Sequence, residues 1–118
     1  MTEGCRSCKI GKKGKMKNLQ RKVLDFTKKY NLAHSNEITT LDLVSEIGEV
    51  AKEILKSTNY GQTPPQKREE LKKEIGDALY SLINLANLNE IDLEEAVTLV
   101  MEKYEKRLQK GSAGSENE

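Results

Sequence analysis

Two stretches of this sequence each carry a pair of carboxylates three residues apart, enclosed by apolar residues. Glu46 and Glu49 lie in "LVSEIGEVAKEIL", and Glu74 and Asp77 lie in "LKKEIGDALYSLI". Residues three apart on a helix face the same side, so each pair presents two carboxylates to one patch. If the two helices pack antiparallel, the four acids converge. They then cannot all stay ionised without compensating positive charge.

A hard divalent cation supplies that charge. Mg²⁺ prefers oxygen ligands, keeps several waters and is typically completed by substrate phosphates. The spacing therefore predicts a Mg²⁺ site, with Mn²⁺ as a second possible ion. Glu pairs at this spacing also occur on solvated helix faces, so the two copies in apolar context favour the metal site. Gly48 and Gly76 stand inside the pairs and are expected to let a partner helix or a ligand approach closely.

The elements that must position these acids are helices. The chain has 118 residues with no Trp, one Phe and four Tyr, and it is rich in Leu, Lys and Glu, which favours an all-α fold. The apolar spacing predicts helices over about 17–31, 37–57, 64–87 and 93–108. Possible caps precede the last three helices: Ser35, Asn36, Thr39 or Thr40, then Thr63 with Pro64 and Gln66, then Asp92 with Glu95.

Four helices with short connections predict an antiparallel four-helix bundle. The second and third helices are apolar almost all round, and one small bundle cannot bury two whole helices. We therefore expect a homodimer or a homotetramer.

The chain is expected to divide into a disordered basic arm at 1–17, an all-α domain at 18–110 and a flexible tail at 111–118. The arm holds six Lys/Arg against one Glu and has no apolar period. The remainder is mildly acidic, which argues against a nucleic-acid partner. No apolar run reaches the roughly 18 residues of a membrane span, and the basic N-terminus lacks the apolar region of a signal peptide. A cytoplasmic location is the expectation.

The only cysteines, Cys5 and Cys8, lie in the arm and form half of a zinc site. We expect two reduced thiols there. A zinc site shared between two chains is the alternative.

The paired motifs resemble a known family. "LDLVSEIGEVAKEI" followed by "KKEIGDALYSLINLA" is similar to the signature of the all-α nucleoside triphosphate pyrophosphatases, the MazG-like group, over about residues 19–108. The resemblance implies an oligomer that binds Mg²⁺ and hydrolyses (deoxy)nucleoside triphosphates to the monophosphate and pyrophosphate. Nucleotide-pool house-cleaning is the role that it suggests. The implied metal ligands are Glu46, Glu49, Glu74 and Asp77.

Other positions depart from the family pattern. Ser45 stands where many members have a Glu, and Val100 and Tyr104 stand where relatives have polar phosphate contacts, although Arg107 is kept. We assign the catalytic base to Glu49 and contacts to the outer phosphates to Lys52, Lys56 and Arg107. Without Trp, stacking on the base would fall to an aromatic ring or the single histidine: Phe26, Tyr30, Tyr60 or His34.

A non-catalytic helical interaction module, with the basic arm as its binding element, is the alternative from a different class. It would have no reason to bind Mg²⁺ tightly. A di-iron bundle requires Glu-x-x-His motifs on two helices, and His34 is the only histidine.

Overall fold

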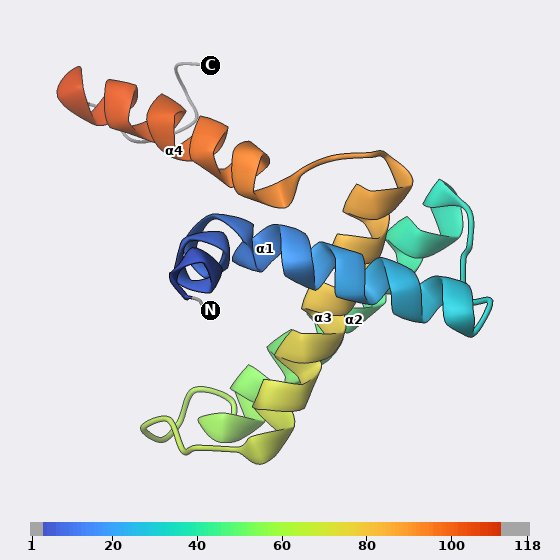
Figure 1. Cartoon of the computed structure of the whole chain (residues 1–118). Helices are drawn as coiled ribbons and strands as arrows, with labels where there is room; N and C mark the ends of the chain where they lie inside the picture. Colours follow the sequence, from blue (N-terminus) through green and yellow to red (C-terminus); the bar gives the residue numbers. More distant parts are fainter. Residues whose placement is uncertain (1–3, 112–118) are drawn as a thin grey trace. The chain divides into compact units, whose positions relative to one another are not determined.

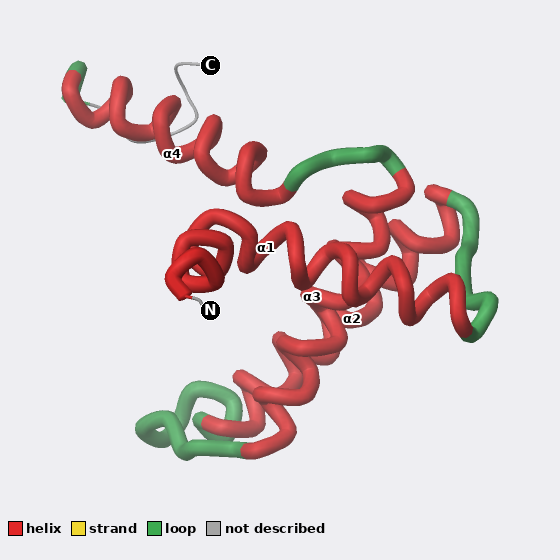
Figure 2. The backbone as a smooth tube through the Cα atoms, viewed as in Figure 1, coloured by secondary structure: helices red, strands yellow, loops and turns green. Residues whose placement is uncertain are grey.

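The computed structural model describes the backbone of residues 4–111 and the side chains of residues 14–111. Over that range the chain forms α1 (Gly4–Lys29), α2 (Asn36–Ser57), α3 (Glu69–Leu88) and α4 (Leu93–Gln109), with no strand among the described residues (Figures 1 and 2). The all-α prediction is therefore confirmed. No helix in the described part of the chain is long and apolar enough to cross a membrane.

The helices belong to two compact units. One unit is Gln20–Glu90, and the other combines Met1–Leu19 with Ile91–Glu118. Helix α1 contributes to both units. The carboxylate pairs lie wholly within the first unit, so the two units are described separately.

Helices α2 and α3 form an antiparallel hairpin joined by residues 58–68 (Figure 1). Among the four predicted caps of α2, Ser35 is the one used, because its Oγ accepts the Ile38 N–H at 3.2 Å. After Ser57 the chain reverses through three residues with positive φ, namely Asn59, Tyr60 and Gly61. The short reversal brings the start of α3 back alongside α2.

The predicted start of α3 at Thr63–Gln66 is wrong. The helix begins at Glu69, and its N-cap residue, Arg68, makes no side-chain capping bond. Pro65 disfavours helical geometry at the residue before it, which here is Pro64. The Gln66 N–H donates instead to the Ser57 carbonyl at 2.9 Å, which closes the connection onto the end of α2.

The second half of α1 packs across α3 through polar pairs and aromatic rings. Gln20 Nε2 donates to Asn87 Oδ1 at 3.1 Å, and Asn87 Nδ2 donates to the Gln20 carbonyl at 3.1 Å. The rings of Phe26 and Tyr80 meet edge to face with centroids 6.2 Å apart. Helix α3 also carries the buried apolar side chains of the described chain: Ala78, Ile83 and Ala86.

In the other unit, the predicted cap of α4 is confirmed. Asp92 Oδ1 accepts the Glu95 N–H at 3.1 Å, and Lys17 Nζ lies 3.6 Å from Asp92 Oδ2. The carboxylate thus satisfies a free N–H of the first turn and also meets a lysine from α1. The positive end of the helix dipole favours a negative side chain at this position.

Helix α1 starts earlier than expected. We predicted a disordered arm over residues 1–17, whereas the helix begins at Gly4. Extending an existing helix is less costly than nucleating one, and the lysines that fill this segment are good helix formers. Cys5 and Cys8 lie outside the described side chains, and the predicted division into arm, domain and tail stays a prediction.

Candidate functional site

The α2–α3 hairpin brings three of the four predicted metal ligands together. Glu46, Glu74 and Asp77 each offer a carboxylate oxygen, and these oxygens all lie within 4.8 Å of one another. Glu46 and Glu74 are half-buried and Asp77 is exposed. The grouping follows from the antiparallel pairing, because α2 contributes Glu46 from its middle and α3 contributes the other two from adjacent turns. We call these three residues the acidic cluster.

The acidic cluster leaves negative charge uncompensated. Desolvation raises the pKa of the Glu46 carboxyl above its ordinary value, and the neighbouring carboxylates raise it further: Asp77, Glu74, Glu49 and Asp42. Crowded carboxylates of this kind are offset by a bound cation. All of the donor atoms are carboxylate oxygens, the type that Mg²⁺ and Mn²⁺ accept. The residues present therefore fit the predicted ion.

Glu49 stands apart from the three converging oxygens. It lies one turn further along α2, is exposed, and acts on Glu46 as a nearby negative charge. Its roles as fourth ligand and as base stay predictions. The expected close approach at Gly48 and Gly76 is not found within the described chain, because a Cβ added at either position would meet nothing within 4 Å.

The predicted phosphate-binding cations lie in different surroundings. Lys56 Nζ is 3.7 Å from Glu53 Oε2, and Lys52 is exposed. Arg107 is buried in the other unit, with its guanidinium 5.8 Å from the centre of the Tyr104 ring. Their contacts with phosphate stay predictions.

An ion pair that the sequence reading missed fixes the loop before α3. Arg68 Nε donates to Glu53 Oε1 at 2.7 Å, and Glu53 is buried. The hydrogen bond from Arg68 holds the pKa of Glu53 below its ordinary value. Glu53 lies seven residues after Glu46, and this helical spacing was the signal that could have drawn attention to it.

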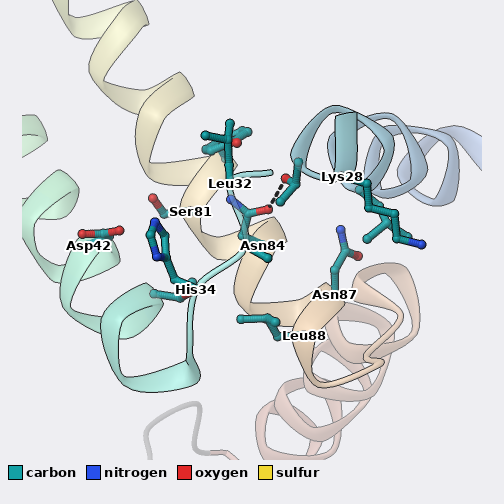
Figure 3. Close-up of a pocket in the computed structure, with 13 residues that line it drawn as sticks. Lys28, Leu32, His34, Asp42, Ser81, Asn84, Asn87 and Leu88 are labelled. Carbon is teal, nitrogen blue, oxygen red and sulfur yellow. Dashed lines mark hydrogen bonds between the residues drawn. The ribbon is translucent and has the colours of Figure 1, made fainter. Parts of the chain in front are cut away.

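The same unit contains a cavity of about 430 Å³ (Figure 3). Its walls come from α1, the α1–α2 loop, α2 and α3. Asp42, four residues before Glu46, and Ser81, four residues after Asp77, both line it. Residues four apart are neighbours along a helix face, so the cavity begins one helical turn from the acidic cluster. The full lining is Leu24, Thr27, Lys28, Leu32, Ala33, His34, Thr39, Asp42, Tyr80, Ser81, Asn84, Asn87 and Leu88.

Polar groups occupy two sides of this cavity. His34, Asp42 and Ser81 lie on its α2 side, while Asn84 and Asn87 face α1 (Figure 3). Of the four side chains considered for stacking on a base, His34 lines the cavity, whereas Phe26, Tyr30 and Tyr60 do not. The sequence reading did not single out Asp42, Ser81 or Asn84 as site residues. Asp42 could have been found, since it extends the acidic face of α2 by one turn.

The chain is similar to proteins of one family. Residues 34–112 match the family model of the MazG nucleotide pyrophosphohydrolase domain. The protein YpjD of Bacillus subtilis, described as uncharacterized, is 33% identical over 96 residues, which cover 78% of this chain and 85% of YpjD.

Two solved structures share the fold. The crystal structure of the Bacillus-conserved MazG protein, a nucleotide pyrophosphohydrolase, has a TM-score of 0.64 at 31% identity and covers 75% of this chain and 87% of that chain. A crystal structure of YPJD from Bacillus subtilis has a TM-score of 0.65 at 33% identity and covers 75% of this chain and 93% of that one.

Proposed function

From the premise that this chain belongs to the MazG nucleotide pyrophosphohydrolase family, and is a hydrolase acting on nucleotide pyrophosphate bonds, we propose its substrate and its metal. The substrate is a (deoxy)nucleoside triphosphate, and the products are the monophosphate and pyrophosphate. The required ion is Mg²⁺, with Mn²⁺ as a substitute. The observation that carries this proposal is the convergence of Glu46, Glu74 and Asp77 oxygens within 4.8 Å of one another.

The acidic cluster would hold the ion, with Glu49 as a further ligand. A divalent cation at this position supplies charge that neutralises phosphate oxygens and makes a nearby water more acidic. The carboxylates would repel the negatively charged phosphates wherever no cation lies between the two groups. This repulsion would restrict the triphosphate to positions in which the ion bridges it to the acidic cluster. The half-buried setting of Glu46 and Glu74 strengthens these electrostatic interactions relative to bulk water.

We assign Glu49 the role of base. It is on the same helix as Glu46 and one turn away, and its exposure leaves it open to a water molecule. A general base has to lie within hydrogen-bond reach of the proton that it removes. Lys52, Lys56 and Arg107 remain our candidates for the outer phosphates. Lys56 lies beside Glu53, further along α2 in the direction away from the cavity.

The cavity is our candidate for the nucleoside. Its volume of about 430 Å³ lies in the range of small-molecule pockets, roughly 300–1,000 Å³. Asp42 and Ser81 connect it to the acidic cluster within one helical turn. A triphosphate at the cluster could therefore place its sugar and base in the cavity without leaving the α2–α3 surface.

A panel of ribo- and deoxyribonucleoside triphosphates, assayed with and without Mg²⁺, tests the proposal. We expect pyrophosphate and the monophosphate as products, and no turnover when the ion is chelated. Release of the diphosphate with orthophosphate would contradict the assigned bond. Absence of both turnover and tight Mg²⁺ binding would instead favour the non-catalytic interaction module.

We further propose that the protein is a homodimer or a homotetramer built on α2 and α3. Both helices leave large apolar side chains exposed: Leu41, Val44, Ile47, Ile54, Leu55, Ile75, Leu79 and Leu82. Contiguous exposed apolar surface marks an association site. Light scattering is expected to report an oligomer at micromolar concentration, and a monomer there would contradict this assembly.

A further inference from the structure

We propose that Asp42 and Ser81 form a sugar subsite, which binds the hydroxyl groups of the nucleotide's sugar and favours ribonucleotides over deoxyribonucleotides. The inference rests on the proposed function in placing the phosphates at the acidic cluster and the nucleoside in the cavity. It adds the residues that read the sugar and the direction of the preference. The observation that carries it is the buried hydroxyl of Ser81, which lines the cavity and has no hydrogen-bond partner in the described part of the chain.

The buried hydroxyl groups of the described chain are of two kinds. Thr27 and Ser57 each have a backbone carbonyl of the preceding turn within hydrogen-bond distance, at 2.9 Å and 2.8 Å. Ser81 and Thr39 are buried as well, and neither of their hydroxyls has a hydrogen-bond partner among the described residues.

The two hydroxyls without a partner both line the cavity, Ser81 from α3 and Thr39 from α2. Buried polar groups in folded proteins are nearly always hydrogen-bonded, and leaving one unpaired lowers stability. Water in the cavity can pair with these hydroxyls in the free protein, and a polar group of a ligand can replace that water. The two hydroxyls therefore indicate that the cavity receives a ligand with hydrogen-bonding groups on this side.

Asp42 and Ser81 lie at the same level of the hairpin. Glu46 and Asp77 meet in the acidic cluster. Because α2 and α3 are antiparallel, four residues back from Glu46 and four residues forward from Asp77 lead in the same direction, to Asp42 and to Ser81. Each step is about 6 Å along the helix. Figure 3 shows Asp42 and Ser81 on one side of the cavity, and the charge of Asp42 contributes to the raised pKa of Glu46.

This level of the hairpin corresponds to the sugar of the nucleotide. The sugar joins the phosphates to the base, so it has to occupy the part of the cavity that is nearest to the acidic cluster. On α2 the lining residues are Asp42 and, three residues farther from the cluster, Thr39. On α3 the lining begins with Tyr80 and Ser81 and continues away from the cluster to Leu88.

A carboxylate beside a hydroxyl is suited to bind neighbouring hydroxyl groups. An ionised carboxylate accepts hydrogen bonds and donates none, and Asp42 makes no hydrogen bond or ion pair with the described residues. Ribose offers two neighbouring hydroxyls as donors, whereas deoxyribose offers one. The Ser81 hydroxyl both accepts and donates, so it can pair with either of them. The direction of the preference therefore follows from the number of sugar hydroxyls and does not depend on how a side chain is turned.

Binding of uncharged nucleosides to the full chain tests the inference without requiring hydrolysis. Adenosine, 2′-deoxyadenosine and 2′,3′-dideoxyadenosine form a matched series, because they share one base and lose one hydroxyl at each step. In a titration followed by NMR, with metal ions chelated, we expect adenosine to bind about tenfold more tightly than 2′-deoxyadenosine, and the dideoxy form to bind most weakly. Equal affinities, or no binding of any of the three at millimolar concentration, would overturn the inference.

Variants of the two residues separate reading of the sugar from other roles. Asp42→Ala is expected to bring the ratio of the adenosine and 2′-deoxyadenosine affinities close to one, and Asp42→Asn, which keeps one acceptor oxygen, to give an intermediate ratio. Ser81→Ala should lower the ratio less, because hydrogen bonds to a charged acceptor are stronger than those to a neutral one. Since metal ions are chelated, these changes cannot arise from a lost metal ligand.

Thr39→Val is the matched control, because it removes the other buried hydroxyl of the cavity that has no partner in the described chain. Thr39 lies beyond the sugar, so the ratio of affinities should stay as it is in the unchanged protein. A ratio that falls in Thr39→Val but persists in Asp42→Ala and Ser81→Ala would overturn the assignment. If Asp42→Ala fails to fold, Asp42→Asn and Ser81→Ala still decide.

Hydrolysis of the corresponding triphosphates separates the two proposals. If no triphosphate is hydrolysed while the preference for adenosine is found and is lost in Asp42→Ala, the proposed function is wrong and the sugar subsite stands. If triphosphates are hydrolysed but the nucleosides bind equally well, the proposed function stands and the sugar subsite is wrong.

Discussion

Helix α2 carries two glutamates of low exposure, Glu46 and Glu53, whose environments are opposite. Glu46 is surrounded by other carboxylates, and its pKa is raised. Glu53 accepts a hydrogen bond from Arg68 at 2.7 Å and has Lys56 at 3.7 Å, and its pKa is lowered. The two residues are seven positions apart, so they lie on nearly the same face of the helix.

The difference in pKa arises from the residues that α3 and the loop before it place beside each glutamate. Beside Glu46, α3 presents Glu74 and Asp77, whereas beside Glu53 the residue before α3 is Arg68. A carboxylate paired with a cation stabilises the fold, while one crowded by like charges lowers stability until a cation arrives. Residue type alone therefore does not distinguish an acid that is paired with a cation of the chain from an acid that is crowded by like charges. The neighbours across the hairpin do.

The largest effect is expected from removing a carboxylate of the acidic cluster. Asp77→Asn, Glu46→Gln or Glu74→Gln should each lower hydrolysis by roughly a hundredfold or more, because the ion loses a ligand. The free protein should melt at the same temperature or higher, since like charges are removed. Turnover rates and melting curves with and without Mg²⁺ measure both. A variant that loses helicity together with activity would place these acids with Glu53 as structural residues.

The second-largest effect is expected from breaking the ion pair between Glu53 and Arg68. Glu53→Gln should lower the melting temperature, because Arg68 loses its charged acceptor, while the turnover rate of the folded protein changes little. Arg68→Gln should have a similar effect on stability, and the double variant should cost less than the sum of the two. Additive losses would show that the two side chains do not act as a pair.

The dependence of stability on pH should have opposite signs at the two sites. Glu53 has a pKa below the ordinary 4.5, so its contribution is present above that pH and is lost as pH falls through the folded-state pKa. Glu46 has a pKa above 4.5, so its penalty is present at neutral pH and disappears as pH falls to that value. Melting curves should be recorded between neutral and acidic pH. As the pH falls, the increase in melting temperature caused by Glu46→Gln and the decrease caused by Glu53→Gln should both shrink toward zero. A gain or a loss that is unchanged over this range would contradict the assigned electrostatics.

The smallest effect is expected from deleting residues 1–15, which contain neither the acidic cluster nor the Glu53–Arg68 pair. Hydrolysis should remain nearly unchanged, because the acidic cluster and the cavity both lie within the unit Gln20–Glu90. A tightly bound zinc that is lost on Cys5→Ser or Cys8→Ser would overturn this expectation and support the zinc site shared between chains.

Local patterns in the sequence were sufficient to find four helical segments, though not every helix start, and to single out the three acids that the hairpin brings together. The spacing of Glu46, Glu74 and Asp77 follows from helical periodicity, and the caps at Ser35 and Asp92 follow from chemistry within four residues of chain. The start of α3 was misplaced because the Pro64 ring fits a first turn, whereas its neighbour Pro65 disfavours that turn. The backbone restriction that Pro65 places on Pro64 therefore outweighed the preference of Pro64 for a first helical turn.

The cavity and the Glu53–Arg68 pair could not be read from local patterns. Thr27 and Asn84 are 57 positions apart, and nothing in the periodicity of α1 or α3 states which turns cross. Arg68 meets Glu53 across a loop with three successive positive φ values, at Asn59, Tyr60 and Gly61. Backbone conformation sets the path of that loop, and the path decides which residue meets Glu53. The amino-acid composition of the loop does not predict that path.

The α2–α3 hairpin also has a consequence for the order in which the protein folds. Its helices are adjacent in sequence and joined by residues 58–68, so a short loop closure brings Glu46 to Glu74 and Asp77. Contacts of low sequence separation form fast, and the entropy lost on closing a loop rises only slowly with its length. The proposed ligands of the ion would therefore assemble early, whereas the cavity also needs α1 to dock on α3, through contacts such as Thr27 to Asn84 that are 57 positions apart. A folding intermediate with the hairpin formed and α1 undocked would bind the ion but not the nucleoside.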